Sequence, residues 1–261
     1  MGKKSKYRLL SLATALSIIL TGLGGASLIS AAETESYGGG SGTELDPYII
    51  SSAEHMAQLD ADTVAGNTDG KYYKLTADIT LSGDFTIGQN RESKTSIASA
   101  SGANSFVTDV KSFEGVFDGN FHTVTYTYSD CYAYGGLFSY LEGAEVKNLI
   151  VKGTSTGANL IFGSVAAVIN NSVIDSCISE VEITDARKYP AGIAAIVQDS
   201  QITNTENRGC VVTRKDAAGG TDSDVSHGSI NNHLKTLFST KNENTVQGGH
   251  SNVGGIAAVV L

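Results

Sequence analysis

Cysteine is scarce in this chain, which has three cysteines among 261 residues. Cys131, Cys177 and Cys210 follow no metal-binding or redox spacing, and an odd number argues against a disulfide framework in an exported protein. Cys177 aligns with Leu149 and Thr205 of a sequence repeat, so we predict a small buried side chain for it.

The sequence also lacks the short motifs of several enzyme classes. It contains no His-Glu-x-x-His, the helix motif of zinc peptidases. The glycine run at 38–40 precedes no strand-to-helix phosphate motif. We therefore predict no catalytic, cofactor-binding or metal-binding residues, and no cofactor.

Amphipathic runs of helical length are missing from the repeated part of the chain. A block that starts at Gly136 recurs at Ser164 and at Gly192, a period of 28 residues, and its third copy ends at Asn204. Each copy has short apolar runs separated by Gly, Asn, Asp or Ser, and two prolines against thirty glycines suit a turn-rich all-β chain. This period without helices favours an all-β solenoid, a right-handed parallel β-helix.

Equivalent positions of the three copies fall into columns. Stacked about 4.8 Å apart, the expected apolar columns are Leu137, Val165 and Ile193; Leu141, Ile169 and Val197; and Val146, Ile174 and Ile202. Asn148, Ser176 and Asn204 align beside a predicted turn. We expect these polar side chains to hydrogen-bond from coil to coil, as asparagine ladders do.

The first 32 residues have the organisation of a secretory signal peptide. A basic head precedes an apolar run from Leu9 to Leu23, and Ser30, Ala31 and Ala32 supply small residues at the cleavage site. An uncleaved membrane anchor is the alternative, although the run is short for a span. We predict a secreted or cell-surface protein without a membrane span after signal removal.

Acidic residues outnumber basic ones, with 27 Asp and Glu against 18 Lys and Arg. Four of the basic residues lie in the predicted signal, which has no acidic residue, so the mature chain keeps 14 basic and 27 acidic residues, a formal charge of −13. A chain this acidic is expected to avoid nucleic acid and anionic membrane surfaces.

The mature chain is predicted to have a linker at 33–42 and one β-helix domain at 43–261. The sequence Ser51-Ser-Ala-Glu54 is a capping box for a short helix, which we expect to cover the first end of the β-helix. Loop insertions are expected near 88–112 and 214–252, where polar sequence separates the strands.

Four motifs occur in the order found in one group of bacterial surface proteins. They are Gly42-Thr-x-x-x-Pro-Tyr-x-Ile50, Tyr72-Tyr-x-Leu-x-x-Asp-Ile79, Phe113-x-Gly-x-Phe-Asp-Gly-Asn-x-His-x-Val124 and Gly136-Leu-Phe138. The chain resembles surface proteins with GLUG-type repeats, and the β-helical region that precedes the peptidase domain of immunoglobulin A1 proteases. The resemblance covers residues 40–205 and implies an exported right-handed β-helix, but no reaction. Phe121 departs from the family, which usually has Gly at that position.

The segment from Asp118 to His122 is the strongest candidate for catalysis. A carboxylate and an imidazole this close can perform acid–base chemistry, and some β-helix enzymes cleave polysaccharides with carboxylates on one face. Alternatively, Asp118 and Asn120 form a tight turn with His122 packed beside it. We prefer the turn, because the sequence supplies no second positioned carboxylate.

Other binding candidates rest on fewer features. His227, His233 and His250 have no recognised zinc spacing. Asp222 and Asp224 begin like a calcium loop whose Gly and Glu are out of place. A tyrosine cluster is a candidate sugar or protein contact surface, or alternatively stacks along a sheet: Tyr126, Tyr128, Tyr132, Tyr134 and Tyr140.

We interpret the chain as a non-catalytic secreted or cell-surface β-helix scaffold, a stalk or adhesion module at the N-terminus of a larger bacterial surface protein. Host or cell-wall glycans or proteins are the expected partners. The alternatives are a carbohydrate-active enzyme of pectate-lyase-like fold and the accessory region of a surface metallopeptidase. Residues 255–260 restart the repeat just before the sequence stops, so we also expect a β-helix truncated at its C-terminal end.

Overall fold

The structure is a computed structural model, and it describes residues 36–89, 94–99, 102–107, 110–129, 134–156, 161–186, 189–213 and 254–261. All of them belong to the unit that spans 35–261. The predicted signal peptide at 1–32 and the predicted insertion at 214–252 lie outside the described residues.

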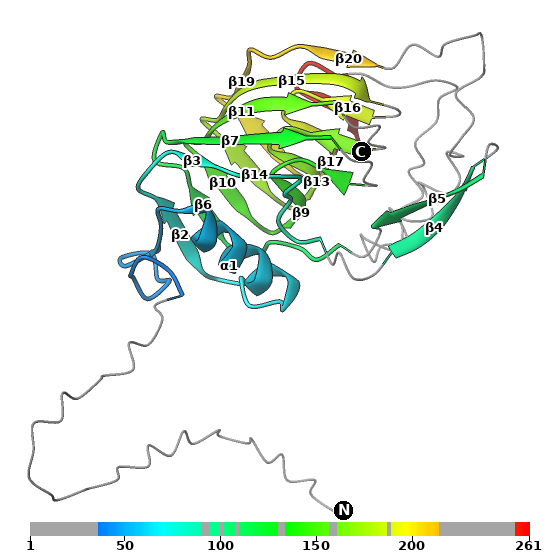
Figure 1. The fold of residues 1–261 in the computed structure, drawn as a ribbon. Helices are drawn as coiled ribbons and strands as arrows, with labels where there is room; N and C mark the ends of the chain where they lie inside the picture. The colour runs from blue at the N-terminus through cyan, green and yellow to red at the C-terminus, as the bar shows by residue number, and fades with distance from the viewer. Residues whose placement is uncertain are drawn as a thin grey trace, which may run out of the picture. The chain divides into compact units, whose positions relative to one another are not determined.

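Successive coils of the chain contribute strands to four parallel sheets (Figure 1). Sheet 1 stacks β1 (Tyr48–Ile50), β2 (Tyr72–Leu75), β6 (Val116–Asp118), β10 (Glu145–Lys147), β14 (Val173–Asp175) and β18 (Gln201–Thr203). Sheet 2 stacks β3 (Ile79–Thr80), β7 (Thr123–Tyr128), β11 (Ile150–Ser155), β15 (Ile178–Ala186), β19 (Glu206–Asn207) and β20 (Val211–Thr213). Sheet 3 stacks β8 (Tyr134–Gly135), β12 (Ile161–Gly163) and β16 (Tyr189–Ala191). Sheet 4 stacks β9 (Phe138–Glu142), β13 (Ala166–Asn170), β17 (Ala194–Gln198) and β21 (Ala257–Val260).

The strand register follows the repeat found in the sequence. Val146 pairs with Ile174, and Ile174 pairs with Ile202, each 28 positions further along the chain. Sheet 4 keeps the same spacing, since Ile169 pairs with Leu141 on one side and with Val197 on the other. The predicted parallel β-helix and its apolar columns are therefore confirmed.

One continuous core runs through the stacked coils. Val146 and Ile174 are completely buried, as are Leu141 and Ile169 in the neighbouring column. The earlier coils fill the same space with aromatic rings; their centroids lie 5.1 to 5.7 Å apart for the pairs Tyr73–Phe113, Phe113–Phe138 and Phe117–Phe138. Burying such columns is the main stabilising contribution available to a solenoid, because each coil packs only on its neighbours.

One helix, α1 (Ala53–Val64), packs against this core, as predicted for a short N-terminal helix. Its N-cap is Ser52, whose hydroxyl accepts a hydrogen bond from the His55 amide at 3.4 Å, one residue later than the capping box indicated. Met56 and Leu59 are fully buried, so the helix covers apolar side chains of the first coils.

Residues 37–42, within the predicted linker, hydrogen-bond to the first coil. The Gly38 amide donates to the Ile49 carbonyl at 2.9 Å, and the Ile49 amide donates to the Gly39 carbonyl at 2.9 Å. Tyr37 is 4% exposed, and its hydroxyl donates to Asp62 of α1 at 2.6 Å. This segment therefore joins α1 to β1 and β2.

Two elements differ from the sequence-based expectation. The alternating run at 72–81 looks like one strand but forms β2 and β3, because the chain turns at a corner without interrupting the alternation of buried side chains. The predicted insertion near 88–112 contains an antiparallel hairpin of β4 (Lys94–Ser99) and β5 (Gly102–Val107). Its polar, small-residue sequence gave no signal for strands.

Candidate functional site

The corner between sheet 1 and sheet 2 repeats the same backbone geometry in three coils. Asn148, Ser176 and Asn204 have φ values of 51°, 54° and 49° there. A positive φ is unfavourable for most residues with a side chain, and Asn is among the residues that tolerate it best. The backbone ladder nevertheless continues through the corner, because the Asn148 amide donates to the Asp175 carbonyl at 3.1 Å. We call the column of turn residues Asp118, Asn148, Asp175, Ser176, Thr203 and Asn204 the polar corner.

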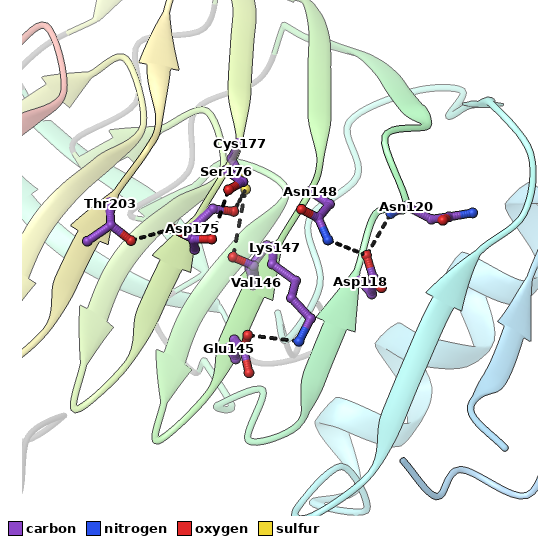
Figure 2. A network of polar contacts seen from close by, with 10 residues as sticks. All are labelled: Asp118, Asn120, Glu145, Val146, Lys147, Asn148, Asp175, Ser176, Cys177 and Thr203. Atoms are coloured by element: carbon purple, nitrogen blue, oxygen red, sulfur yellow. Dashed lines mark hydrogen bonds and ion pairs between the residues drawn. The ribbon is translucent and has the colours of Figure 1, made fainter. Parts of the chain in front are cut away.

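Aspartates connect successive coils in the polar corner (Figure 2). The Asn148 side-chain amide donates to Asp118 at 3.0 Å, and the Asn204 amide donates to Asp175 at 2.8 Å. The predicted coil-to-coil bonds are present, but each asparagine bonds to an aspartate of the coil before it, and not to another asparagine. A direct amide ladder fails because Ser176, the middle member of the column, has no amide group.

Asp175 accepts three side-chain hydrogen bonds. The hydroxyls of Thr203 and Ser176 and the amide of Asn204 all donate to its two carboxylate oxygens. These bonds lower the pKa of Asp175, with Thr203 making the largest contribution. A carboxylate held in this way stabilises the turn and is a weak base for catalysis.

Charges alternate along the outer face of sheet 1. The register places Lys74, Asp118, Lys147 and Asp175 in successive coils of one column. The Lys147 ammonium also donates to Glu145 at 2.9 Å, which raises the pKa of Lys147 (Figure 2). Opposite charges on neighbouring strands are favourable, so this column supports the register of the coils.

Asp118 and His122, the acid and the imidazole considered for catalysis from the sequence, bond to different partners. Asp118 accepts the Asn120 amide at 2.8 Å and shapes the turn, as the preferred interpretation stated. His122 instead bonds through Nδ1 to Asp78, at 3.1 Å. Asp78 also accepts the Thr123 amide at 2.9 Å, and that bond, followed by the bond to His122, lowers its pKa.

Asp78 was missed by the sequence analysis as a partner of His122. The two residues are 44 positions apart, and coil closure brings them together only after the hairpin of β4 and β5 has been excluded from the coil. The available signal was the position of Asp78 just before β3, which aligns with the start of β7 in the next coil.

Phe121 occupies a strained turn at the edge of the polar corner. The His122 amide donates to the Gly119 carbonyl at 2.8 Å, and both central residues have positive φ, 47° for Asn120 and 60° for Phe121. This is a type I′ turn, which favours Asn followed by Gly. Phe121 stands at the Gly position, and 66% of its surface is exposed.

A second charged column lies on the outer face of sheet 2. Lys152 pairs with Glu180 at 2.9 Å, and Arg208 pairs with Glu180 at 3.5 Å and with Glu206 at 2.7 Å. Lys152 is the largest cause of the lowered pKa of Glu180. The three main members are spaced 28 residues apart, so the sequence repeat contained this signal.

Glu142 occupies the corner between sheet 4 and sheet 1, where it collects donors in the same way. It accepts hydrogen bonds from the Tyr140 hydroxyl, from Asn170 at 2.8 Å and from Asn171 at 3.0 Å. Both asparagines belong to the following coil. Corner carboxylates of this solenoid thus serve repeatedly as acceptors for the neighbouring coil.

The tyrosine cluster is not a contact surface in the part that the structure describes. Tyr126 and Tyr128 are 0% exposed and point into the core, and Tyr134 and Tyr140 are 3% and 5% exposed. Tyr132 lies outside the described residues. The strand alternates Thr with Val or Tyr, and the threonines take the outer face, which is why the tyrosines face inward.

Cys177 is fully buried, as predicted. Its thiol donates to the Asp175 carbonyl at 3.3 Å, and burial raises its pKa to about 12. Within the described ranges, Cys177 and Cys210 are both free thiols. The raised pKa makes Cys177 a poor nucleophile, because the thiolate is the reactive form.

Candidate metal residues were tested only where the structure describes them. No group of three or more His, Cys, Asp or Glu side chains in that part of the chain is arranged to hold a metal ion. His227, His233, His250, Asp222 and Asp224 lie outside the described residues. Among the described helices, none combines the length and apolar character needed to cross a membrane.

Comparison with known proteins does not show a family for this chain. No protein-family model matches the chain, and no curated protein matches it. The chain is similar to a crystal structure described as a candidate immunoglobulin A1 protease from Bacteroides ovatus, with 13% identity and a TM-score of 0.36 over 85% of this chain and 86% of that chain. A TM-score this low carries no argument about activity, and membership of the GLUG-type surface proteins stays a prediction.

Proposed function

We propose that this protein is a non-catalytic, secreted or cell-surface β-helix scaffold that serves as a stalk or adhesion module. The observation that supports it is the use of polar side chains along the coils. Asp118, Asp175 and Glu142 each accept hydrogen bonds from a neighbouring coil, so their carboxylates are engaged in holding the scaffold together.

The stacked core supports the same proposal. Each further coil adds about 4.8 Å of length without a change in cross-section, and the register of Val146, Ile174 and Ile202 is maintained through successive coils. An element built in this way suits the display of a surface at a fixed distance from its attachment point. Adhesion to glycans or proteins is the role we assign to it.

Localisation is tested by antibody labelling of intact cells that express the full chain. Surface labelling or recovery from the medium, with a mature N-terminus at Glu33, is the expected result. Deletion of residues 1–32 should keep the protein inside the cell. Retention of the full chain in the cytoplasm, with an uncleaved N-terminus, would contradict the proposal.

One observation favours the rival function, cleavage of a polysaccharide. His122 and Asp78 form an exposed acid–imidazole pair, with side chains 32% and 72% exposed. The assay is release of reducing or unsaturated sugar ends from soluble xylan, mannan and polygalacturonate. We expect no release by the wild-type protein; release that disappears in His122→Ala and in Asp78→Asn would establish the rival function instead.

A further inference from the structure

We propose that the polar corner, together with Phe121, is a binding surface for a neutral linear polysaccharide. Phe121 supplies the apolar contact, and the amide and hydroxyl groups of the corner supply the polar edge. This inference rests on the proposed adhesion function and deepens it by naming the ligand class and the residues that contact it.

The backbone conformation of Phe121 costs free energy that a glycine at the same position would avoid. A non-glycine residue at φ 60° is strained by roughly 1–2 kcal/mol, and glycine would relieve that strain in a type I′ turn. The ring gains little burial in return, since 66% of its surface is exposed. Backbone strain combined with an exposed aromatic ring points to a contact made outside the protein.

The turn that carries Phe121 is held rigidly. The Phe121 amide donates to the Asn148 carbonyl at 2.7 Å, and the Gly119 amide donates to the Lys147 carbonyl at 2.8 Å. The Asn120 side chain reaches the Leu75 carbonyl of the preceding coil at 3.3 Å. Bonds to both neighbouring coils fix the backbone that carries the ring, so the turn loses little conformational entropy when a ligand packs on Phe121.

The neighbouring coils continue the surface with neutral polar groups. Asn148 and Asn204 use their NH2 groups internally, which directs each side chain and leaves the amide oxygen as an acceptor. Asn148 is half-buried, and Asn204 is exposed. These two amide oxygens lie in alternate coils, about 9.6 Å apart along the stack, and are suited to a polymer that presents hydroxyl donors at intervals.

Charge balance favours a neutral ligand over an ionic one. Although the mature chain is strongly acidic, the column beside the polar corner contains two lysines and two aspartates in alternation: Lys74, Asp118, Lys147 and Asp175. The formal charges of these four residues cancel, and Glu145 and Asp78 beside them add only a small negative excess, so this face lacks the strong single-sign field that attracts a polycation or a polyanion. A sugar ring presents both an apolar face for Phe121 and hydroxyls for the amides.

The test is a pull-down of the full-length mature protein with four insoluble neutral polysaccharides: cellulose, chitin, xylan and mannan. We expect retention on at least one of them, unchanged at about 1 M salt, where charges are screened beyond about 3 Å. Phe121→Asn and Phe121→Gly should weaken that retention about tenfold, the loss expected for one aromatic contact. Val260→Ala, which trims an exposed apolar side chain on sheet 4, is the matched control and should bind like the wild type.

Each outcome either supports or overturns polysaccharide binding at Phe121. Both Phe121 variants relieve backbone strain, so lost binding cannot be ascribed to unfolding when their melting temperatures equal or exceed that of the wild type. Absence of retention on all four polysaccharides, equal retention of the variants, or retention that is lost at about 1 M salt would overturn the inference. None of these results would disprove the scaffold, which is tested by localisation and by the absence of cleavage.

Discussion

The sharpest prediction compares alanine substitutions at two isoleucines of the same core column, in successive coils. Ile174 is 0% exposed and lies between Val146 and Ile202 in the register of sheet 1. Ile202 occupies the same column one coil later but is only partly buried. The substitutions Ile174→Ala and Ile202→Ala are therefore chemically identical and differ in burial alone.

Ile174→Ala should lower the free energy of unfolding by about 4 kcal/mol, because fully buried Ile or Leu to Ala changes cost about 2–5 kcal/mol through lost burial and the cavity left behind. Ile202→Ala should cost about 1–2 kcal/mol, since a partly exposed side chain loses less burial and leaves no closed cavity.

Urea unfolding followed by far-UV circular dichroism measures both values. Hydrogen exchange should accompany it, because solenoids can unfold in parts and a single transition cannot be assumed. Equal losses for the two variants, or a loss below about 1 kcal/mol for Ile174→Ala, would refute a core built from stacked columns.

Three further predictions concern the corners and the close approach of strands. Asp175→Asn should lower the melting temperature at pH 7. The difference should shrink as the pH falls from the ordinary carboxyl pKa of about 3.9 through the lowered pKa of Asp175, because the hydrogen-bonded carboxylate stabilises the folded state only while it is ionised. A difference independent of pH would contradict this. Gly153→Ala should lower the free energy of unfolding by more than about 3 kcal/mol, since the new Cβ would lie 1.8 Å from the Tyr126 carbonyl oxygen. Gly143→Ala, with open space around its Cβ, should lower it by about 1 kcal/mol. Thermal unfolding compares the two variants, and equal effects would contradict the close approach. Phe121→Asn should raise the free energy of unfolding by about 1 kcal/mol in urea denaturation, and a loss of stability would show that the turn is unstrained.

The repeat predicted the fold because a solenoid converts sequence spacing directly into spatial neighbours. Aligning Val146, Ile174 and Ile202 was sufficient to place them in adjacent strands, and the same spacing held Lys152, Glu180 and Arg208 in one charged column. Local periodicity is informative here, because each coil contacts only the coils beside it.

Contacts that depend on irregular coils could not be derived in the same way. The bond between His122 and Asp78 joins coils whose spacing is lengthened by the hairpin of β4 and β5. Tyr126 and Tyr128 face inward because they alternate with threonines along β7. Strands such as β13 are buried on both faces, so alternation does not show the inward face in every strand of the solenoid. The capture of asparagine amides by Asp118 and Asp175 depended on side-chain direction at residues with positive φ.

Disulfide trapping tests the 28-residue stacking most directly. In a background with Cys131→Ser and Cys210→Ser, the pair Lys152→Cys and Glu180→Cys lies in directly paired positions of β11 and β15, where a Cα separation of about 4.8 Å permits a disulfide. The pair Lys152→Cys and Arg208→Cys spans two coils, about 9.6 Å, and is the control. The account predicts rapid oxidation of the first pair and none of the second; no disulfide in the first pair, or equal oxidation of both, would contradict it.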